Sequence, residues 1–144
     1  MVIRDLGGDL AESFASYIVA NYAPYLSLNR VYNYLRSSHR VRKERVAELF
    51  NRARESHFAF PVELFERSEE EGEPQKVYLI DTDYAAALGY QLSISRAMEN
   101  CVYLELMRRG WECRVFYWKE YGKAQGAEVD FVLARDFRVE EIVH

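Results

Sequence analysis

Apolar residues recur at intervals of three and four along the first third of the chain, which is the spacing of one face of a helix. This pattern predicts helices over residues 9–22, 27–37 and 41–55. Pro24 should end the first helix, and Ser27 can cap the second. The side chains expected to form the buried stripes are Leu10, Phe14, Tyr17, Ile18, Tyr22, Leu28, Val31, Tyr32, Leu35, Val41, Val46, Leu49, Phe50 and Ala53.

The hydrophobic period then changes to that of strands. Residues 57–67 and 76–81 predict two strands joined by a charged tip at 68–75, and Pro61 indicates an edge position or a bulge in the first strand. Three helices followed by a hairpin is the outline of a winged helix, whose second and third helices form a helix-turn-helix. We therefore expect a winged-helix domain over residues 1–80.

The second half of the chain predicts helices followed by an antiparallel meander, so the fold class is α+β. Ser95 is expected to cap the longer helix, and Gly110 to end it. The expected elements are helices over 81–90 and 95–110 and strands over 113–120, 128–134 and 138–144. The inner side of the longer helix is expected to carry Met98, Cys101, Val102, Leu104 with Glu105, and Leu106.

Composition narrows the class of protein. The chain has 144 residues, 49% of them hydrophobic and 15% aromatic, which suits one compact domain or two small ones sharing a core and excludes a disordered chain. No apolar run approaches the ~20 residues that cross a membrane, and the N-terminus lacks a signal pattern. Cys101 and Cys113 are expected to be buried, reduced thiols, with a disulfide as the alternative. Reduced thiols fit the cytoplasm, where we place the protein.

Positive charge is concentrated in one segment. Residues 30–54 carry eight basic and two acidic residues, a net charge of +6, whereas the whole chain carries −4. Such asymmetry is typical of a local nucleic-acid face, or of the solvated side of two helices. Phosphates would be met near the start of the third helix, where the helix dipole favours anions. The candidate nucleic-acid-binding residues are Arg40, Arg42, Lys43, Arg45 and Arg52.

Three stretches of the chain resemble a known family. "KVYLIDTDYAAALGY", "AMENCVYLELMRRG" and "GAEVDFVL", in this order, are similar to the C-terminal region of a large archaeal and bacterial family of predicted AAA+ ATPases. The resemblance implies a P-loop ATPase, then a winged helix, then a domain distantly related to the PD-(D/E)XK nucleases, here over residues 81–144. It covers nearly the whole chain, but the P-loop pattern G-x-x-x-x-G-K-[ST] is absent. We therefore expect the chain to be a fragment, with the ATPase upstream and the last strands cut short.

The resemblance also implies a metal site. Glu99 matches the helix acid and Asp130 the strand acid that hold Mg²⁺ or Mn²⁺ in PD-(D/E)XK nucleases, where the metal assists phosphodiester cleavage. The third acid should fall at the chain end, where Glu141 is one or two positions early and His144 stands about where the acid or amide is expected. The family's lysine lies beyond the last residue. The triad is thus incomplete, so we expect no activity in this chain and no required cofactor.

Three functions remain open. The favoured one is a non-catalytic accessory region of an AAA+ ATPase-like protein that binds double-stranded DNA, the ATPase domain or another protein. The second is a metal-dependent nuclease using Glu99 and Asp130. Against it, Glu99 can be an ordinary surface acid, and Glu128 and Asp130 can share a solvated sheet face. The third is an oligomerisation domain in which the segment HFAFPVELF pairs with another copy. The acidic tip at 68–75 would repel phosphates, so we expect no wing contact with DNA.

Overall fold

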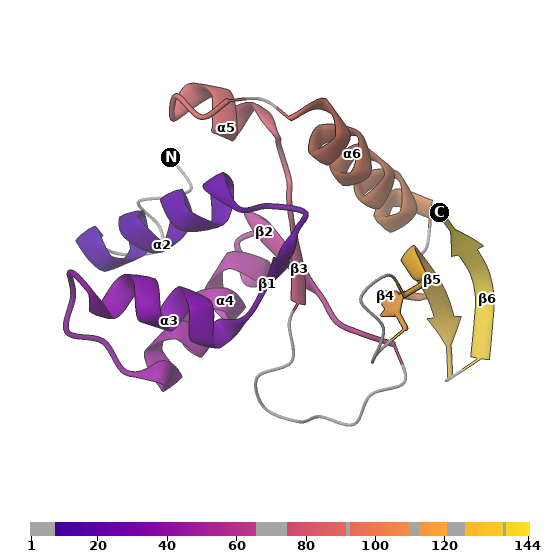
Figure 1. The fold of residues 1–144 in the computed structure, drawn as a ribbon, viewed down its shortest axis with the longest axis horizontal. Coiled ribbons are helices and arrows are strands. Elements are labelled where there is room, and N and C mark those ends of the chain that lie inside the picture. The colour runs from indigo at the N-terminus through magenta and orange to yellow at the C-terminus, as the bar shows by residue number, and fades with distance from the viewer. Residues whose placement is uncertain (1–7, 66–74, 92, 110–112, 121–125, 137) are drawn as a thin grey trace.

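The fold is of the α+β class, as the sequence predicts, and is given by a computed structural model (Figure 1). The structure describes residues 8–65, 75–91, 93–109, 113–120, 126–136 and 138–144. These residues form five helices and two three-stranded antiparallel sheets, and none of the helices is long and apolar enough to cross a membrane. The helices are α2 (Gly8–Ala20), α3 (Leu28–Arg36), α4 (Lys43–Glu55), α5 (Asp83–Ala87) and α6 (Ile94–Arg109). The strands are β1 (Tyr25–Leu26), β2 (Ala59–Val62), β3 (Gln75–Leu79), β4 (Arg114–Lys119), β5 (Glu128–Arg135) and β6 (Arg138–Val143).

The first three helices form where the apolar periodicity predicts them, with ends that differ by at most two residues. Ser27 caps α3 as expected, because its side chain accepts a hydrogen bond from the backbone N–H of Arg30 at 3.1 Å. The centres of the predicted stripes are fully buried, among them Phe14, Val31 and Leu49. Burial of these stripes is what makes such short helices stable.

The first sheet brings together strands that are far apart in the sequence. β3 lies between β1 and β2, and Pro61 is in β2 at the sheet edge, as predicted. The hydrophobic pattern does not predict β1, which is two residues long. Ala23 has a φ of 73° and donates its N–H to the carbonyl of Val77 in β3 at 2.8 Å. The chain therefore turns at Ala23 and comes to lie beside β3. This turn places Tyr25 opposite Lys76.

The second sheet has β5 at its centre, between β4 and β6. Residues Phe131–Ala134 are all buried, because the two faces of β5 pack against separate hydrophobic clusters. The two sheets meet where Leu64 pairs with Tyr117. Tyr117 accepts from the N–H of Phe65 at 2.8 Å and donates to the carbonyl of Glu63 at 3.1 Å. The end of the segment HFAFPVELF therefore pairs with β4 of its own chain.

One hydrophobic cluster runs through both halves of the chain. It extends from Ala11 in α2 to Leu133 in β5, so the predicted units 1–80 and 81–144 contribute to the same core. In Figure 1, α2, α3 and α4 lie on the left, α6 and the second sheet lie on the right, and β3 runs between them. β3 is thus the strand against which both halves are positioned. The boundary near residue 80 stays a prediction.

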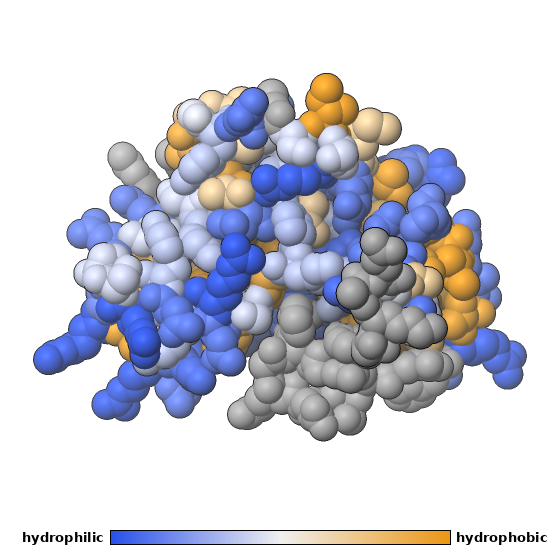
Figure 2. Space-filling view, in the orientation of Figure 1, coloured by the Kyte–Doolittle hydropathy of each residue, from blue (hydrophilic) through white to orange (hydrophobic). Residues whose placement is uncertain are grey.

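Helix α6 turns a different face to the core than its apolar residues predict. Asn100 is fully buried, whereas Met98 is 64% and Val102 is 39% exposed. Cys101 was expected to be a buried thiol but is exposed, and both it and Cys113 are free. Hydrophobic side chains accordingly reach the surface over α6 in Figure 2. The predicted inner face is confirmed for Leu104 and Leu106, which pack against the core, and is wrong for Met98, Cys101 and Val102. Polar side chains take part of the inner face instead, and hydrophobic periodicity does not detect them.

The start of α6 is held by such contacts and lies one residue earlier than predicted. The hydroxyl of Ser93, rather than that of Ser95, accepts from the backbone N–H of Arg96, at 3.5 Å. Arg96 donates to the carbonyls of Ala20 at 3.0 Å and Tyr22 at 2.8 Å, and its guanidinium lies 4.4 Å from the centre of the Tyr22 ring. Because α2 has no basic residue in its last turn, Arg96 supplies the cation that its carbonyl end favours.

Asn100 completes the hydrogen bonding of β3 beyond the end of β1. Its amide accepts from the backbone N–H of Leu79 and donates to the carbonyl of Leu79, both at 2.8 Å. These backbone groups lie on the side of β3 that β1 is too short to cover, since β1 pairs with Gln75 and Lys76 alone. The side chain therefore replaces a missing strand and fixes α6 on β3.

We expect the substitution Asn100→Ala to lower the free energy of unfolding by ~2–4 kcal/mol, because it leaves two buried backbone groups without partners. Urea unfolding followed by circular dichroism measures this change. Asn33→Ala, at an exposed position of α3, is the matched control and should change stability by less than ~0.5 kcal/mol. Equal small effects of the two substitutions would contradict the role given to Asn100.

Candidate functional site

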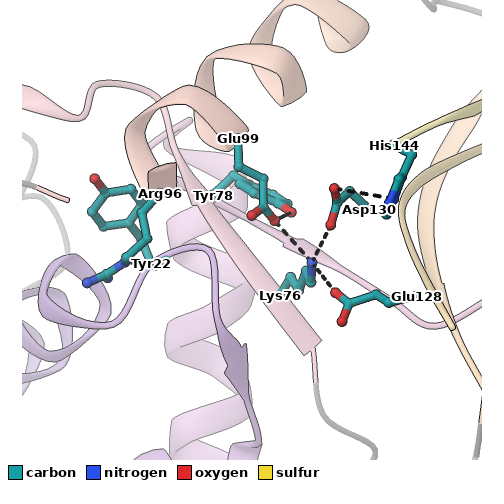
Figure 3. Close-up of polar contacts among 8 residues, drawn as sticks. All are labelled: Tyr22, Lys76, Tyr78, Arg96, Glu99, Glu128, Asp130 and His144. Carbon is teal, nitrogen blue, oxygen red and sulfur yellow. Dashed lines mark hydrogen bonds and ion pairs between the residues drawn. The ribbon is translucent and has the colours of Figure 1, made fainter. Parts of the chain in front are cut away.

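The most unusual group in the described structure is a buried lysine. Lys76 is 3% exposed, and its ammonium lies 2.9 Å from Glu128 Oε1, 3.0 Å from Glu99 Oε1 and 3.5 Å from Asp130 Oδ1 (Figure 3). The rings of Tyr25 and Tyr117 complete the surroundings, with their centres 5.4 and 5.7 Å from the ammonium. An ammonium in such a place must be charge-compensated, and here three carboxylates do so.

Three elements bring these groups together. Lys76 projects from β3, Glu99 from the inner face of α6, and Glu128 and Asp130 from one face of β5. The strand alternation that puts the last two on a common face is confirmed, because both reach the same ammonium. Tyr78, two residues along β3 from Lys76, donates its hydroxyl to Glu99 Oε1 at 2.6 Å. Glu99 is thus fixed by two donors from one strand.

Opposing effects set the protonation of the cluster. Burial alone would lower the pKa of Lys76, but its contacts with Glu128 and Glu99 outweigh burial and raise the pKa above its ordinary value. Burial would raise the pKa of Glu128, but nearby donors, chiefly Tyr25 and Lys76, lower it. Burial, and after it the Glu99 carboxylate, raises the pKa of Tyr78. At neutral pH the cluster therefore holds a charged ammonium and neutral tyrosines.

The carboxylates outnumber the ammonium, so the cluster has spare negative charge. The carboxylates of Glu99, Glu128 and Asp130 are 26–35% exposed, which allows water to screen part of it. His144 Nδ1 lies 3.9 Å from Asp130 Oδ2, so the imidazole adds a second positive charge to the cluster when it is protonated. The site is therefore a cluster of three carboxylates around the Lys76 ammonium, and its net charge is negative.

The structure brings together the two residues that the resemblance implies as metal ligands. Glu99 and Asp130 both contact Lys76, although they come from α6 and β5. Carboxylate oxygens are ligands that Mg²⁺ prefers. Within the described residues, however, no group of three or more His, Cys, Asp or Glu side chains is arranged to hold a metal ion. The ammonium of Lys76 fills the space between the carboxylates, so a metal would have to displace it.

A second candidate surface lies at the start of α4. Arg40, Arg42 and Lys43 are exposed there, and Arg42 occupies the N-cap position without a side-chain hydrogen bond to the helix. Lys43 and Arg36 lie 5.7 and 5.6 Å from the centre of the Tyr32 ring, which adds Arg36 to the same surface. Hydrophilic side chains crowd this region, at the lower left of Figure 2. Basic groups at the positive end of a helix repel one another, so an anion would be favoured here.

The other two predicted nucleic-acid-binding residues differ from these. Arg45 is half-buried and pairs with Glu48 at 2.8 Å, which neutralises part of its charge. Arg52 is exposed, but it lies more than two turns further along α4, ~13 Å from Lys43 along the helix axis. The predicted set therefore divides into a compact basic cluster of Arg40, Arg42 and Lys43 and two separate arginines.

Sequence reasoning missed Lys76 and did not include Glu128 among the site residues. A lysine beginning the apolar strand KVYLI was a usable signal, because a charged residue followed by a buried run requires a partner. Its partners lie in α6 and β5, and spacing along the sequence does not reveal them.

We expect Lys76→Met to cost ~3 kcal/mol or more in unfolding free energy at pH 7, because it leaves three partly buried carboxylates without a cation. The pH dependence should also change sign. In the parent chain the lowered pKa of Glu128 contributes stability above its ordinary value of 4.5, and this is lost as pH falls through the folded-state pKa. In Lys76→Met the neighbouring carboxylates repel Glu128 and raise its pKa, so stability should increase from about pH 7 to about pH 5.

Urea titrations at several pH values measure both effects. Lys43→Met, which removes an exposed lysine at the start of α4, is the control and should keep the parent's pH profile. If Lys76→Met also keeps that profile, the ammonium does not set the carboxylate pKa values.

Comparison with known proteins adds no relative. No protein-family model matches the sequence, and no curated protein and no solved structure matches it either. The resemblance to the AAA+ ATPase family stays a hypothesis on the motifs quoted above. Function is therefore inferred from the contacts of the chain's own residues.

Proposed function

We propose that the chain is a non-catalytic DNA-binding module, and that α3 and α4 are the helix-turn-helix of a winged helix. The order of elements supports this: α2, β1, α3 and α4 precede the β2–β3 hairpin, and the sheet order is β1-β3-β2. α3 and α4 are consecutive along the chain, and the six residues 37–42 join them, which is longer than the three- to four-residue turn typical of a helix-turn-helix. In such a module the second helix of the pair, α4, approaches the DNA.

The basic cluster at the start of α4 is the observation that carries the proposal. Three exposed basic residues lie beside the backbone N–H groups of the first turn of α4: Arg40, Arg42 and Lys43. The side chain of Arg42, at the N-cap position, makes no hydrogen bond to these N–H groups. Phosphate oxygens satisfy both the N–H groups and the side-chain charges. Arg45, the next basic residue of the segment, already pairs with Glu48 and therefore offers less charge to an anion.

Binding of this kind would depend on the DNA backbone more than on base sequence. Further along α4, Glu44, Glu48 and Glu55 are exposed, and these carboxylates oppose deep entry into a groove. The predicted acidic tip at 68–75 lies almost wholly outside the described residues, so a wing contact is not invoked. As the resemblance suggests, such a module would serve as the DNA-recognising tail of an AAA+ ATPase-like protein.

We expect the chain to bind a fluorescently labelled 25-base-pair duplex at micromolar concentration in ~50 mM salt, as measured by fluorescence anisotropy. Substituting Arg40, Arg42 and Lys43 together by Ala should weaken binding at least tenfold. It should also reduce the slope of log affinity against log salt by about 2–3, since each lost phosphate contact removes about 0.9.

The control for this experiment removes the same charge elsewhere. Arg108, Arg109 and Arg138 are exposed on α6 and β6, and their joint replacement by Ala should leave the slope nearly unchanged. If both triple variants lose equal DNA affinity, the loss comes from the change in net charge and not from a site at the start of α4. Absence of binding by the parent chain at ~50 mM salt would rule out the proposal.

The convergence of Glu99, Glu128 and Asp130 supports a second candidate, a metal-dependent nuclease. The donor set is made of hard carboxylate oxygens, which Mg²⁺ and Mn²⁺ accept as ligands. Glu99 and Asp130 would hold the ion, and Mg²⁺ or Mn²⁺ would supply Lewis-acid activation of water. The nuclease requires that the Lys76 ammonium leave the space between the carboxylates, whereas DNA binding at the start of α4 does not.

This second candidate predicts Mn²⁺-dependent nicking of supercoiled plasmid. Glu99→Gln and Asp130→Asn should each reduce the rate more than a hundredfold, because each removes a charged ligand. Glu105→Gln, on the solvent side of α6, is the control and should leave the rate unchanged. Nicking that survives both site substitutions would come from another source.

A further inference from the structure

A cleft of about 390 Å³ opens where the end of α4 meets β2, α6 and β4. Its lining combines two features. Arg54, His57 and Arg114 supply positive or ionisable nitrogen groups, and aromatic residues including Phe60 and Tyr103 supply apolar walls. The volume is in the range of small-molecule sites. We propose that this cleft binds a small planar anion, an aromatic ring that carries a phosphate or carboxylate group.

His57 occupies a backbone position at which helices usually carry glycine. The end of α4 is a Schellman motif, in which the N–H of Phe58 donates to the carbonyl of Ala53 at 2.9 Å and that of His57 to Arg54 at 3.1 Å. His57 occupies the left-handed position of this motif, with a φ of 58°. Glycine takes that conformation with the least strain, so a side chain here costs stability. The strain comes from the Cβ of the residue, and the imidazole beyond it lines the cleft, with its centre 6.2 Å from the centre of the Phe60 ring.

Charge complementarity favours an anion as the occupant. Arg54 extends from the last turn of α4 close to Tyr103: burial raises the pKa of Tyr103 to about 12, and the charge of Arg54 opposes that rise. The side chain of Arg114 is 76% exposed, and its Nη2 lies 3.9 Å from Glu63 Oε2, which is a long contact for an ion pair. Among the described lining residues Glu63 is the one carboxylate. The lining thus has a net positive charge, which rises further when His57 is protonated.

The aromatic walls favour a ring on that anion. Phe60 and Tyr103 lie with their ring centres 5.9 Å apart, and the guanidinium of Arg114 lies 5.0 Å from the centre of the Phe116 ring. Because Phe60 and Tyr103 are only 9% and 3% exposed, a ring would pack mainly against the half-buried Phe116 and the exposed Met107 while its anionic group meets the two arginines. The cleft is at the opposite end of α4 from the basic cluster, ~18 Å along the helix axis, so the two surfaces do not compete for residues.

Nuclear magnetic resonance titration of the ¹⁵N-labelled chain tests the proposal with four probes. Adenosine monophosphate and indole-3-acetate represent the phosphate and carboxylate sources of a ring anion. Adenosine lacks the anionic group, and inorganic phosphate lacks the ring. We expect at least one ring anion to shift amide signals around the cleft with a dissociation constant of about 1 mM or lower, at least tenfold tighter than both control probes. The stronger of the two identifies the source.

Substitutions separate binding from folding. His57→Gly relieves the backbone strain, so the variant should unfold at an equal or higher urea concentration than the parent while binding the ring anion at least threefold more weakly. Replacing Arg54 and Arg114 together by Ala should weaken binding more than tenfold. Arg109→Ala, an exposed arginine of α6 outside the lining, should leave it unchanged.

Three results would overturn the proposal. One is the absence of cleft shifts with either ring anion at 5 mM, a concentration ~5 times the expected dissociation constant. Another is equal affinity for adenosine and adenosine monophosphate, which would show that the cleft binds the ring without recognising the anionic group. The last is unchanged affinity in a folded His57→Gly variant together with unchanged affinity in the double arginine variant.

Discussion

The arrangement of the two halves depends on the compensation of one buried ammonium. Lys76 is nearly inaccessible on the central strand β3, and leaving its charge unpaired there would cost several kilocalories per mole. Its three carboxylate partners come from α6 and β5, so both elements must be placed against β3 before the charge is neutralised. Such a cluster adds less to net stability than its contacts suggest, because the ammonium is desolvated and the three carboxylates are partly desolvated. Its main effect is to favour one relative placement of the elements over others.

The same constraint explains the unusual character of α6. Its inner face carries Arg96, Glu99 and Asn100, which contact α2 carbonyls, Lys76 and the open side of β3. Glu99 balances the charge that β3 buries, and Asn100 completes hydrogen bonding that a two-residue β1 leaves unsatisfied. Arg96 satisfies carbonyl groups at the end of α2. Apolar residues of the helix such as Met98 are consequently displaced to the outside. A helix that packs by specific polar pairs has a fixed rotation and register, whereas a purely apolar face tolerates sliding.

The parts predictable from the sequence are those governed by local physics. The helices α2, α3 and α4 follow from apolar periodicity, and the cap at Ser27 follows from residue type. The common face of Glu128 and Asp130 follows from strand alternation. The other features depend on contacts between distant parts of the chain and could not be predicted from local patterns. β1 forms because β3 pairs with it, and the orientation of α6 about its own axis is set by its polar partners. The resemblance paired Glu99 with Asp130, but it gave no reason to expect an ammonium between them.

The distribution of charge also separates the two candidate functions. DNA attracted to the start of α4 meets the +6 segment, while the remainder of the chain is strongly negative and includes the cluster around Lys76. A phosphodiester is therefore repelled from Glu99 and Asp130 as long as no divalent ion stands between these two carboxylates. Displacing Lys76 by a divalent ion would add one positive charge as well as a Lewis acid, so metal entry would govern both the approach of the backbone and the chemistry. DNA binding at α4 requires neither step and would persist in chelator, which makes the binding role independent of whether the acidic cluster ever functions as a metal site.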